Sequence, residues 1–239
     1  NAEEYVLSDI SFHIEAGQTG GVIGQTGAAK STLVQLIPRL YDATEGVVKV
    51  DGVPVQEYPM AHLREAIAMV LQKNTLFSGN LLDNLRWGKE DASMEEIEEA
   101  CRIACVDEVL ERLPEGYETE MGQGGVNVSG GQKQRICIAR AVACNPELIL
   151  FDEAISSLDA HTQVQIMDLL LDLKEKLGLT YIFITHDLTS ITYLCDDVLF
   201  LYQGRVTEYL PVKQLSEAKD IYARKLLESI IVFDTEEAS

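Results

Sequence analysis

The chain has 239 residues, 46% of them apolar, with 39 acidic against 19 basic residues for a formal net charge of −20. This apolar fraction is enough to bury a sizeable core, and the length suits one large domain. The negative charge excludes binding of nucleic acid or anionic lipid by a broad basic face. The longest apolar run, residues 66–71, is far shorter than the roughly 20 residues that cross a bilayer. The five cysteines form no Cys-x-x-Cys pair, which indicates a reducing compartment and no zinc site.

The first half of the chain predicts short elements separated by turns. Residues 5–23 and 46–55 predict strands broken by glycine, with Asp51-Gly52 at a hairpin corner. Because glycine weakens a strand, the segment that contains Gly20 and Gly21 must be held by its neighbours. Apolar residues recur on one face of a helix predicted at 30–41.

The second half predicts longer elements. A helix is predicted at 93–113, beginning at a capping box of Ser93 and Glu96, and Trp87 is expected to pack in this helical region. A glycine-rich loop at 122–128 precedes a helix at about 130–144. Apolar runs at 148–151, 180–185 and 198–202 predict strands buried on both faces, with a helix at 161–176. This alternation indicates an α/β fold with a mostly parallel sheet, followed by a loose acidic tail at 234–239.

The first chemical motif joins the glycine-containing strand to the helix that begins at residue 30. Its residues are Gly24, Gln25, Thr26, Gly27, Ala28, Ala29, Lys30, Ser31 and Thr32. A glycine-rich turn before a helix lets backbone N–H groups converge on phosphates. Lys30 would reach the β- and γ-phosphates, and Ser31 would bind Mg²⁺. Position 29 normally holds glycine in such loops, so the methyl group of Ala29 would crowd the phosphate or disfavour the required φ. An ordinary strand–turn–helix is the alternative.

Two further motifs lie nearer the middle of the chain. Asp152 and Glu153 end a buried strand, where an aspartate can hold the Mg²⁺ shell and a glutamate can orient a water. Paired acids at a strand end are equally typical of a solvated turn. In Ser129-Gly130-Gly131-Gln132, serine and glutamine predict a helix start, and the glycines leave N–H groups open as a second anion site. One nucleotide does not obviously need two such sites from one chain.

With Ser156-Ser-Leu-Asp159 and Ile184-Thr-His-Asp187, these motifs resemble the ATP-binding cassette of ABC proteins over essentially the whole chain. The resemblance implies an α/β P-loop NTPase fold with a RecA-like core, an N-terminal antiparallel β lobe and a helical lobe. Core and β lobe would take residues 1–75 and 145–210. The helical lobe would take 76–144, and a C-terminal helix with the acidic tail would take 211–239.

The resemblance also implies a role for each matching residue. Lys30 and the loop amides would stabilise charge on the phosphates, Glu153 would polarise the attacking water, and His186 would contact the γ-phosphate. The residues implied for Mg²⁺ are Ser31, Gln72 and Asp152. Family cassettes also stack the adenine on an upstream aromatic residue, whose position falls just before Asn1, and Tyr5 is a weak substitute for it.

The resemblance implies two protein partners. Cassettes pair head to tail, so that the Ser129–Gln132 element of one closes over the ATP that Lys30 of the other holds, and Asp159 contacts the opposite subunit. The second cassette would be either a copy of this chain or a different cassette. The membrane partner would be the transmembrane domains of an ABC transporter, on a separate chain or on another part of the same one. The resemblance would place the chain on the cytoplasmic face of the membrane, with no nucleic-acid partner.

Some alternatives stay open. Residues 1–150 resemble cassettes of multidrug-type exporters, whereas 161–231 resemble those of oligopeptide and nickel importers. A mosaic with a junction near 145–160 would fit, and a divergent natural cassette is the alternative. Ala29 and the missing aromatic favour a nucleotide-binding half that does not hydrolyse. A soluble ABC ATPase for DNA repair or translation is opposed by the charge and by the absence of a long insertion.

Overall fold

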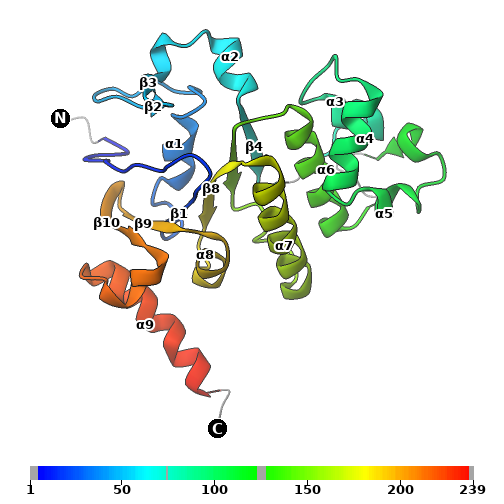
Figure 1. Cartoon of the computed structure of the whole chain (residues 1–239). Coiled ribbons are helices and arrows are strands. Elements are labelled where there is room, and N and C mark those ends of the chain that lie inside the picture. The colour runs from blue at the N-terminus through cyan, green and yellow to red at the C-terminus, as the bar shows by residue number, and fades with distance from the viewer. Residues whose placement is uncertain (1–4, 74, 123–127, 237–239) are drawn as a thin grey trace. The chain divides into compact units, whose positions relative to one another are not determined.

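The computed structural model describes residues 5–73, 75–122 and 128–236 (Figure 1). Its contacts divide the chain into two units, residues 1–57 with 181–239 and residues 58–180. The first unit therefore joins the two ends of the chain, and the second is its middle.

The first unit is built on strands in the order β10-β9-β1-β8. Strand β1 (Thr19–Ile23) runs parallel to β8 (Thr180–Thr185) and to β9 (Asp197–Tyr202), and β10 (Arg205–Pro211) returns antiparallel to β9. Its helices are α1 (Lys30–Gln35), α8 (Leu188–Leu194) and α9 (Ile221–Glu236), with 3₁₀ turns at Val55–Glu57 and Val212–Glu217. A small hairpin joins β2 (Lys49–Val50) to β3 (Val53–Pro54).

The second unit pairs β4 (Ile67–Leu71) in parallel with β7 (Leu148–Asp152). Short strands β5 (Gly79–Asn80) and β6 (Glu120–Met121) pair antiparallel. The helices are α2 (Met60–Glu65), α3 (Leu81–Arg86), α4 (Met94–Ile103), α5 (Asp107–Leu110), α6 (Gly130–Ala143) and α7 (Ala160–Leu177), with a 3₁₀ turn at Gly116–Glu118. The predicted α/β fold with a mostly parallel sheet is confirmed.

Strand β1 is buried along its whole length although it contains two glycines. A Cβ at Gly21 would lie 2.5 Å from a side-chain carbon of Ile191 in α8, and one at Gly20 would lie 2.3 Å from a carbon of Ile14. Neighbouring side chains therefore occupy the space that a Cβ would take at these two positions. These contacts hold the strand in place, as the sequence predicted.

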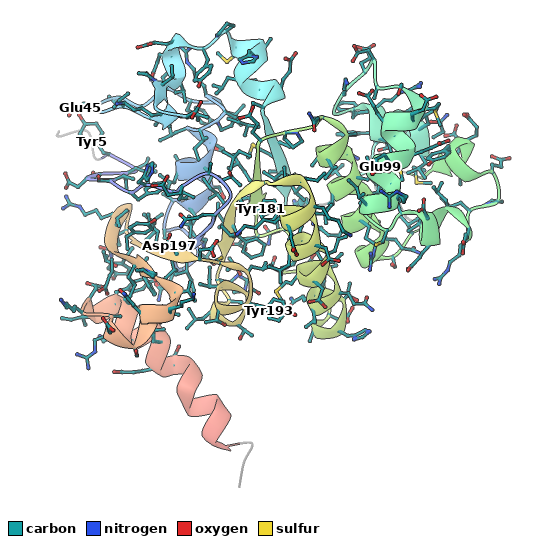
Figure 2. All side chains as sticks on the ribbon, in the orientation of Figure 1. Tyr5, Glu45, Glu99, Tyr181, Tyr193 and Asp197 are labelled. Atoms are coloured by element: carbon teal, nitrogen blue, oxygen red, sulfur yellow. The ribbon has the colours of Figure 1, made fainter. Side chains whose placement is uncertain are left out.

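Apolar side chains from the strands and from α6 and α7 form the cores of the units. Tyr181, at the start of β8, is 1% exposed and is labelled in Figure 2. Each fully buried leucine, isoleucine or phenylalanine contributes about 1.5–3 kcal/mol through removal of apolar surface from water. The apolar runs predicted as strands at 148–151, 180–185 and 198–202 are confirmed.

The helix predicted at 30–41 is shorter than expected, because α1 ends at Gln35. Pro38 lacks an N–H group, and its ring disfavours helical geometry in the residue before it. Arg39 then adopts a left-handed φ of 55°.

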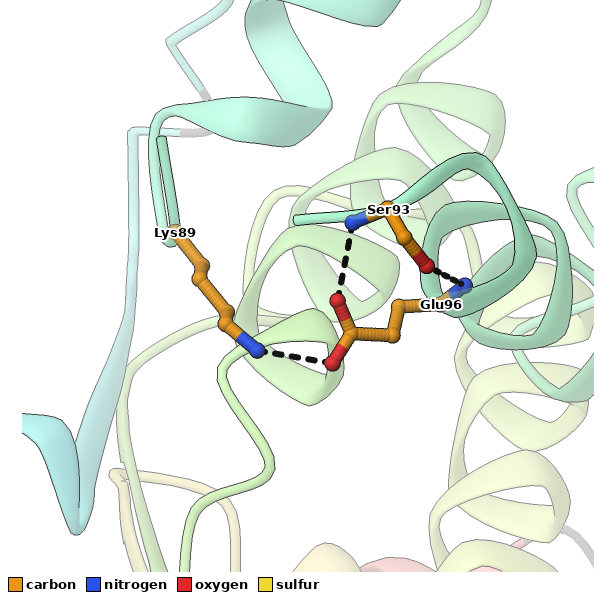
Figure 3. A network of polar contacts seen from close by, with 3 residues as sticks. All are labelled: Lys89, Ser93 and Glu96. Carbon is orange, nitrogen blue, oxygen red and sulfur yellow. Dashed lines mark hydrogen bonds and ion pairs between the residues drawn. The ribbon is translucent and has the colours of Figure 1, made fainter. Parts of the chain in front are cut away.

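The helix predicted at 93–113 is broken into α4 and α5. Its capping box is confirmed: Glu96 N donates to Ser93 Oγ at 3.2 Å, and Ser93 N donates to a Glu96 carboxylate oxygen at 2.8 Å (Figure 3). The other carboxylate oxygen accepts from Lys89 Nζ at 2.7 Å. The break occurs because Cys105 is left-handed, with φ 53°, and Val106 N closes the helix end on the carbonyl of Cys101.

The ends of the chain also differ from expectation. Residues 5–18, all of them described, form no strand, so the antiparallel β region is limited there to the hairpin of β2 and β3. Its turn at Asp51-Gly52 is confirmed, with φ of 49° and 74°. The sequence predicts a loose tail from residue 234. For residues 234–236 this prediction is wrong, because they belong to α9, which ends at residue 236. Residues 237–239 lie outside the described residues. Residues 123–127 of the glycine-rich loop also lie outside them.

Within the described part of the chain, no helix has the length and apolar character of a membrane span.

Candidate active site

The predicted phosphate loop leaves β1 at Gly24 and leads into α1. A Cβ at Gly24 would lie 2.3 Å from the carbonyl oxygen of Leu201 in β9, so only glycine fits. Gly27 has φ +84°, and Ala29 has φ 70° and ψ 25°. The turn therefore uses left-handed backbone twice before the helix begins. The expectation that position 29 requires the φ of a glycine is confirmed, at a cost of about 1–2 kcal/mol for alanine.

Lys30 is 5% exposed, and its ammonium group is held by the loop itself. Its Nζ donates to the carbonyl oxygens of Gly24 at 2.8 Å and Gln25 at 3.3 Å. Carbonyl dipoles thus compensate the buried charge. Ser31 is exposed in the first turn of α1, and Thr32 is half-buried. The loop therefore holds its cation against the same backbone that would cradle phosphate.

His186 follows β8 at the edge of the sheet where the phosphate loop follows β1. The two strands are in register, with Ile23 paired to Thr185, so Gly24 and His186 leave adjacent parallel strands. His186 is exposed. The sheet thus brings the predicted γ-phosphate contact to the edge that carries the phosphate loop.

Asp187 fixes the backbone beside His186 by capping α8. Its carboxylate accepts hydrogen bonds from Thr189 N at 3.0 Å, from Ser190 N at 2.9 Å and from Ser190 Oγ at 2.6 Å. Partial burial raises the pKa of Asp187, but the hydrogen bonds from Ser190 and Thr189 outweigh it, and the pKa is lowered overall. The charged form is therefore the one that the fold stabilises.

In the second unit, parallel pairing brings Gln72 and Glu153 together. Leu71 of β4 pairs with Asp152 of β7, so the residues that follow lie side by side. The Gln72 amide nitrogen donates to a Glu153 carboxylate oxygen at 3.5 Å and to Ser156 Oγ at 3.4 Å. Asp152, the last residue of β7, is half-buried.

Glu153 has an unusual backbone for a glutamate, with φ 50°. Ser156 stabilises this turn, because both its N–H (3.2 Å) and its hydroxyl (2.8 Å) donate to the carbonyl of Glu153. Non-glycine residues in this region cost about 1–3 kcal/mol and concentrate at functional sites. The extended backbone of β7 therefore ends at Asp152, directly before this residue.

The predicted helix start at Ser129 is confirmed as the N-cap of α6. Ser129 N donates to Gln132 Oε1 at 2.8 Å, and Gln132 N donates to Ser129 Oγ at 3.3 Å. A Cβ at Gly131 would lie 2.7 Å from Thr162, so this glycine also permits close packing on α7. A pocket of about 170 Å³ lies beside the motif, lined among others by Glu108, Arg112, Ser129, Gln132, Arg135 and Thr162.

Asp159 caps α7 by accepting from Thr162 N at 3.0 Å and Thr162 Oγ1 at 2.7 Å, and these bonds lower its pKa. Gln163, which the sequence reasoning missed, donates from Nε2 to the carbonyls of Ile155 and Leu158, both at 3.1 Å. It thereby fixes the loop between Glu153 and Asp159. Only the tertiary structure identifies this role, because a glutamine in a helix carries no motif.

Comparison with known proteins identifies the chain. The sequence model of the ABC transporter family matches residues 7–156. The chain belongs to the ABC transporter family. It is 38% identical over 218 residues to the mitochondrial iron-sulfur clusters transporter atm1 of Aspergillus fumigatus, and 40% identical over 224 residues to the ATP-dependent lipid A-core flippase of Coxiella burnetii. The fold matches a bacterial Atm1-family ABC exporter solved with ATP bound, with TM-score 0.85 at 34% identity over 96% of this chain.

The alignments show how much of each relative this ABC chain represents. They cover 91% and 93% of the chain but 30% and 38% of the two curated relatives, and 40% of the solved exporter. The chain thus spans about a third of the length of its curated relatives. Because each alignment runs through residues 145–160 and beyond, they do not confirm a change of family there, and the importer-like second part remains a prediction.

An aromatic surface lies on the helical part of this ABC domain. Phe77 and Trp87 are stacked with ring centroids 3.9 Å apart, and the Arg140 guanidinium lies 5.5 Å from the Phe77 centroid. Arg140 Nε also donates to the carbonyl of Asn84 at 2.9 Å. Trp87 packs in the helical region as predicted but remains 63% exposed. A large aromatic ring with one packed and one open face is typical of a contact surface.

Proposed function

We propose that this chain binds Mg-ATP, pairs with a second cassette around two nucleotides, and hydrolyses ATP to drive transmembrane domains. The observation that carries the proposal is the pairing of Gln72 with Glu153 at the ends of parallel strands. A strained, half-buried glutamate facing an amide is arranged to orient a water rather than to stabilise a turn. Membership of the ABC family supports the same reading.

The phosphate loop supplies the binding groups. Its backbone N–H groups and the Lys30 ammonium would stabilise the charge that develops on the phosphates. Lys30 would exchange the carbonyls of Gly24 and Gln25 for phosphate oxygens, which are stronger acceptors. His186, exposed at the same sheet edge, would contact the γ-phosphate. Glu153 would orient the attacking water and accept its proton.

The side chains proposed for Mg²⁺ fit that ion by their chemistry. Ser31 offers a hydroxyl, Gln72 an amide oxygen and Asp152 a carboxylate, and Mg²⁺ prefers hard oxygen ligands. When bound, the ion would neutralise negative charge on the phosphates. Ser31 is exposed, and Asp152 is half-buried at the end of β7.

The second cassette would contact this chain at the N-terminus of α6. Ser129 and Gly130 are exposed, so this helix terminus is open to an anion from a partner chain. Asp159, exposed at its cap position, would lie at the same dimer interface.

The membrane partner would contact the Phe77–Trp87 surface. The exposed ring of Trp87 next to the Arg140 guanidinium suits a short helix or loop from the transmembrane domains. In that arrangement the cassette would lie on the cytoplasmic face of the membrane. The solved relative is an exporter, which favours export.

The test is Mg-ATP binding and phosphate release by the purified chain, beside Lys30→Ala and Glu153→Gln. We expect Lys30→Ala to lose ATP affinity, and Glu153→Gln to retain binding while turnover falls by about 10²-fold or more. Left-handed Ala29 favours the second candidate, a cassette that binds but does not hydrolyse. Binding without turnover in the wild type would support that candidate, and failure of the folded chain to bind millimolar ATP would refute both.

A further inference from the structure

The peptide bond between Gly24 and Gln25 is held from both sides. Its carbonyl oxygen, on Gly24, accepts from Lys30 Nζ at 2.8 Å. Its N–H, on Gln25, donates to the hydroxyl of Tyr222 at 3.0 Å. Tyr222 is the second residue of α9 and lies 197 positions away in sequence. The C-terminal helix therefore contacts the peptide plane that holds the phosphate-loop lysine.

The structure anchors this tyrosine rather than leaving it mobile. Its ring lies against that of Tyr202, the last residue of β9, with centroids 4.6 Å apart. Asp220 caps the helix by accepting from Tyr222 N at 2.9 Å and from Ala223 N at 3.0 Å. Ala223 is fully buried, which fixes the first turn of α9. The position of the hydroxyl is thus determined by packing and capping together.

A further carboxylate ties α9 to the sheet. Glu208 of β10 accepts from Lys219 N at 2.9 Å and from Asp220 N at 2.9 Å. Hydrogen bonds therefore link β10 to the start of α9, and the start of α9 to the phosphate loop. On the other side of the loop, Gly24 lies against the carbonyl of Leu201. The Gly24–Gln25 peptide is confined by β9, by Lys30 and by Tyr222.

We propose that Tyr222 is a positioning residue of the phosphate loop. Its hydroxyl fixes the Gly24–Gln25 peptide in the orientation in which the loop is ready for phosphate and Lys30 is held beside it. Without the hydroxyl this peptide gains rotational freedom, which nucleotide binding must then remove. The consequence for ATP rests on the proposed function, whereas the contact itself can be measured without nucleotide.

The experiment compares Tyr222→Phe with Tyr202→Phe in the full chain. Both variants remove a phenol hydroxyl and keep the ring pair, but only the first removes the hydrogen bond to the loop. Amide hydrogen exchange at Gln25, resolved to the single residue and measured without nucleotide, should accelerate by about 10-fold in Tyr222→Phe and remain as in wild type in Tyr202→Phe. The KM for ATP should rise about 2- to 10-fold in Tyr222→Phe, the loss expected for one hydrogen bond, with kcat unchanged.

A second variant removes the same hydrogen bond from the other end. Gln25→Pro eliminates the N–H donor and leaves Tyr222 in place. In the Gln25→Pro background, Tyr222→Phe should have no further effect on the KM, because the interaction is already absent. Circular dichroism melting of each variant shows that it is folded.

Three results would overturn the proposal. The first is unchanged amide exchange at Gln25 in Tyr222→Phe, and the second is an equal change in exchange in Tyr202→Phe. The third is an additive effect of Gln25→Pro and Tyr222→Phe on the KM in the double mutant. The proposed function is decided separately. If the wild type fails to bind ATP while Gln25 exchange still responds to Tyr222→Phe, the contact stands and the nucleotide proposal falls.

Discussion

Replacement of Ala29 by glycine should stabilise the apo protein. Ala29 has φ 70° and ψ 25°, where alanine costs about 1–2 kcal/mol relative to glycine. Glycine gives back about 0.4–1 kcal/mol through the entropy of the unfolded chain. The methyl group is only half-buried, so its removal exposes little core. We expect a net gain of about 0.5–1 kcal/mol, which raises the melting temperature by about 1–4 °C in a chain of this size.

The adjacent residue is a matched control. Ala28 is 5% exposed and is not among the described residues with positive φ. Ala28→Gly should therefore destabilise, by about 1 kcal/mol, through backbone entropy and loss of a buried methyl group. Both variants replace alanine by glycine, at neighbouring positions. Opposite changes in the free energy of unfolding would therefore identify the backbone conformation as the cause.

The assay is urea unfolding without nucleotide, followed by titration with Mg-ATP. If Ala29→Gly lowers the free energy of unfolding or leaves it unchanged, the alanine is not strained in solution and the reasoning is refuted. If the loop has one conformation in both states, relief of strain alone leaves ATP affinity unchanged. Any rise in affinity then reports contact between the alanine Cβ and the phosphates.

Further predictions concern other fixed positions. Gly24→Ala should destabilise by more than about 2 kcal/mol in urea unfolding, since its Cβ would lie 2.3 Å from a backbone carbonyl oxygen; a cost under about 0.5 kcal/mol would contradict this. Asp187→Ala should cost about 1 kcal/mol at pH 7 through loss of the α8 cap. Because folding lowers the pKa of Asp187, its contribution is complete above about pH 4 and is lost as pH falls through the folded value. The difference from wild type should therefore shrink in acid, and a constant difference down to pH 2 would oppose the assignment. Ser93→Ala should cost about 1 kcal/mol through loss of the capping box of α4, measured by thermal unfolding; an unchanged melting temperature would show that the box contributes nothing.

Local sequence determined the elements whose signals lie within a few residues. The apolar runs at 148–151 and 180–185 form buried strands, as predicted. A strand that is buried on both faces is a continuous apolar run, so its sequence alone indicates it. The capping boxes at Ser93 and Ser129 formed because their partners lie three residues on. The unusual residue at position 29 also revealed a left-handed backbone, since glycine is what such a turn ordinarily requires.

Tertiary structure decided what depends on distant partners. Gln72 and Glu153 meet because β4 and β7 pair in register, which no local pattern specifies. The predicted helix at 93–113 is broken at Cys105, which has left-handed backbone although it is not glycine, so the sequence does not indicate the break. Tyr222 reaches Gln25 across 197 positions because α9 is anchored on β10, and such a hydrogen bond leaves no periodicity in the sequence. The residue types of the site were thus readable from sequence, whereas the contacts that orient them required the fold.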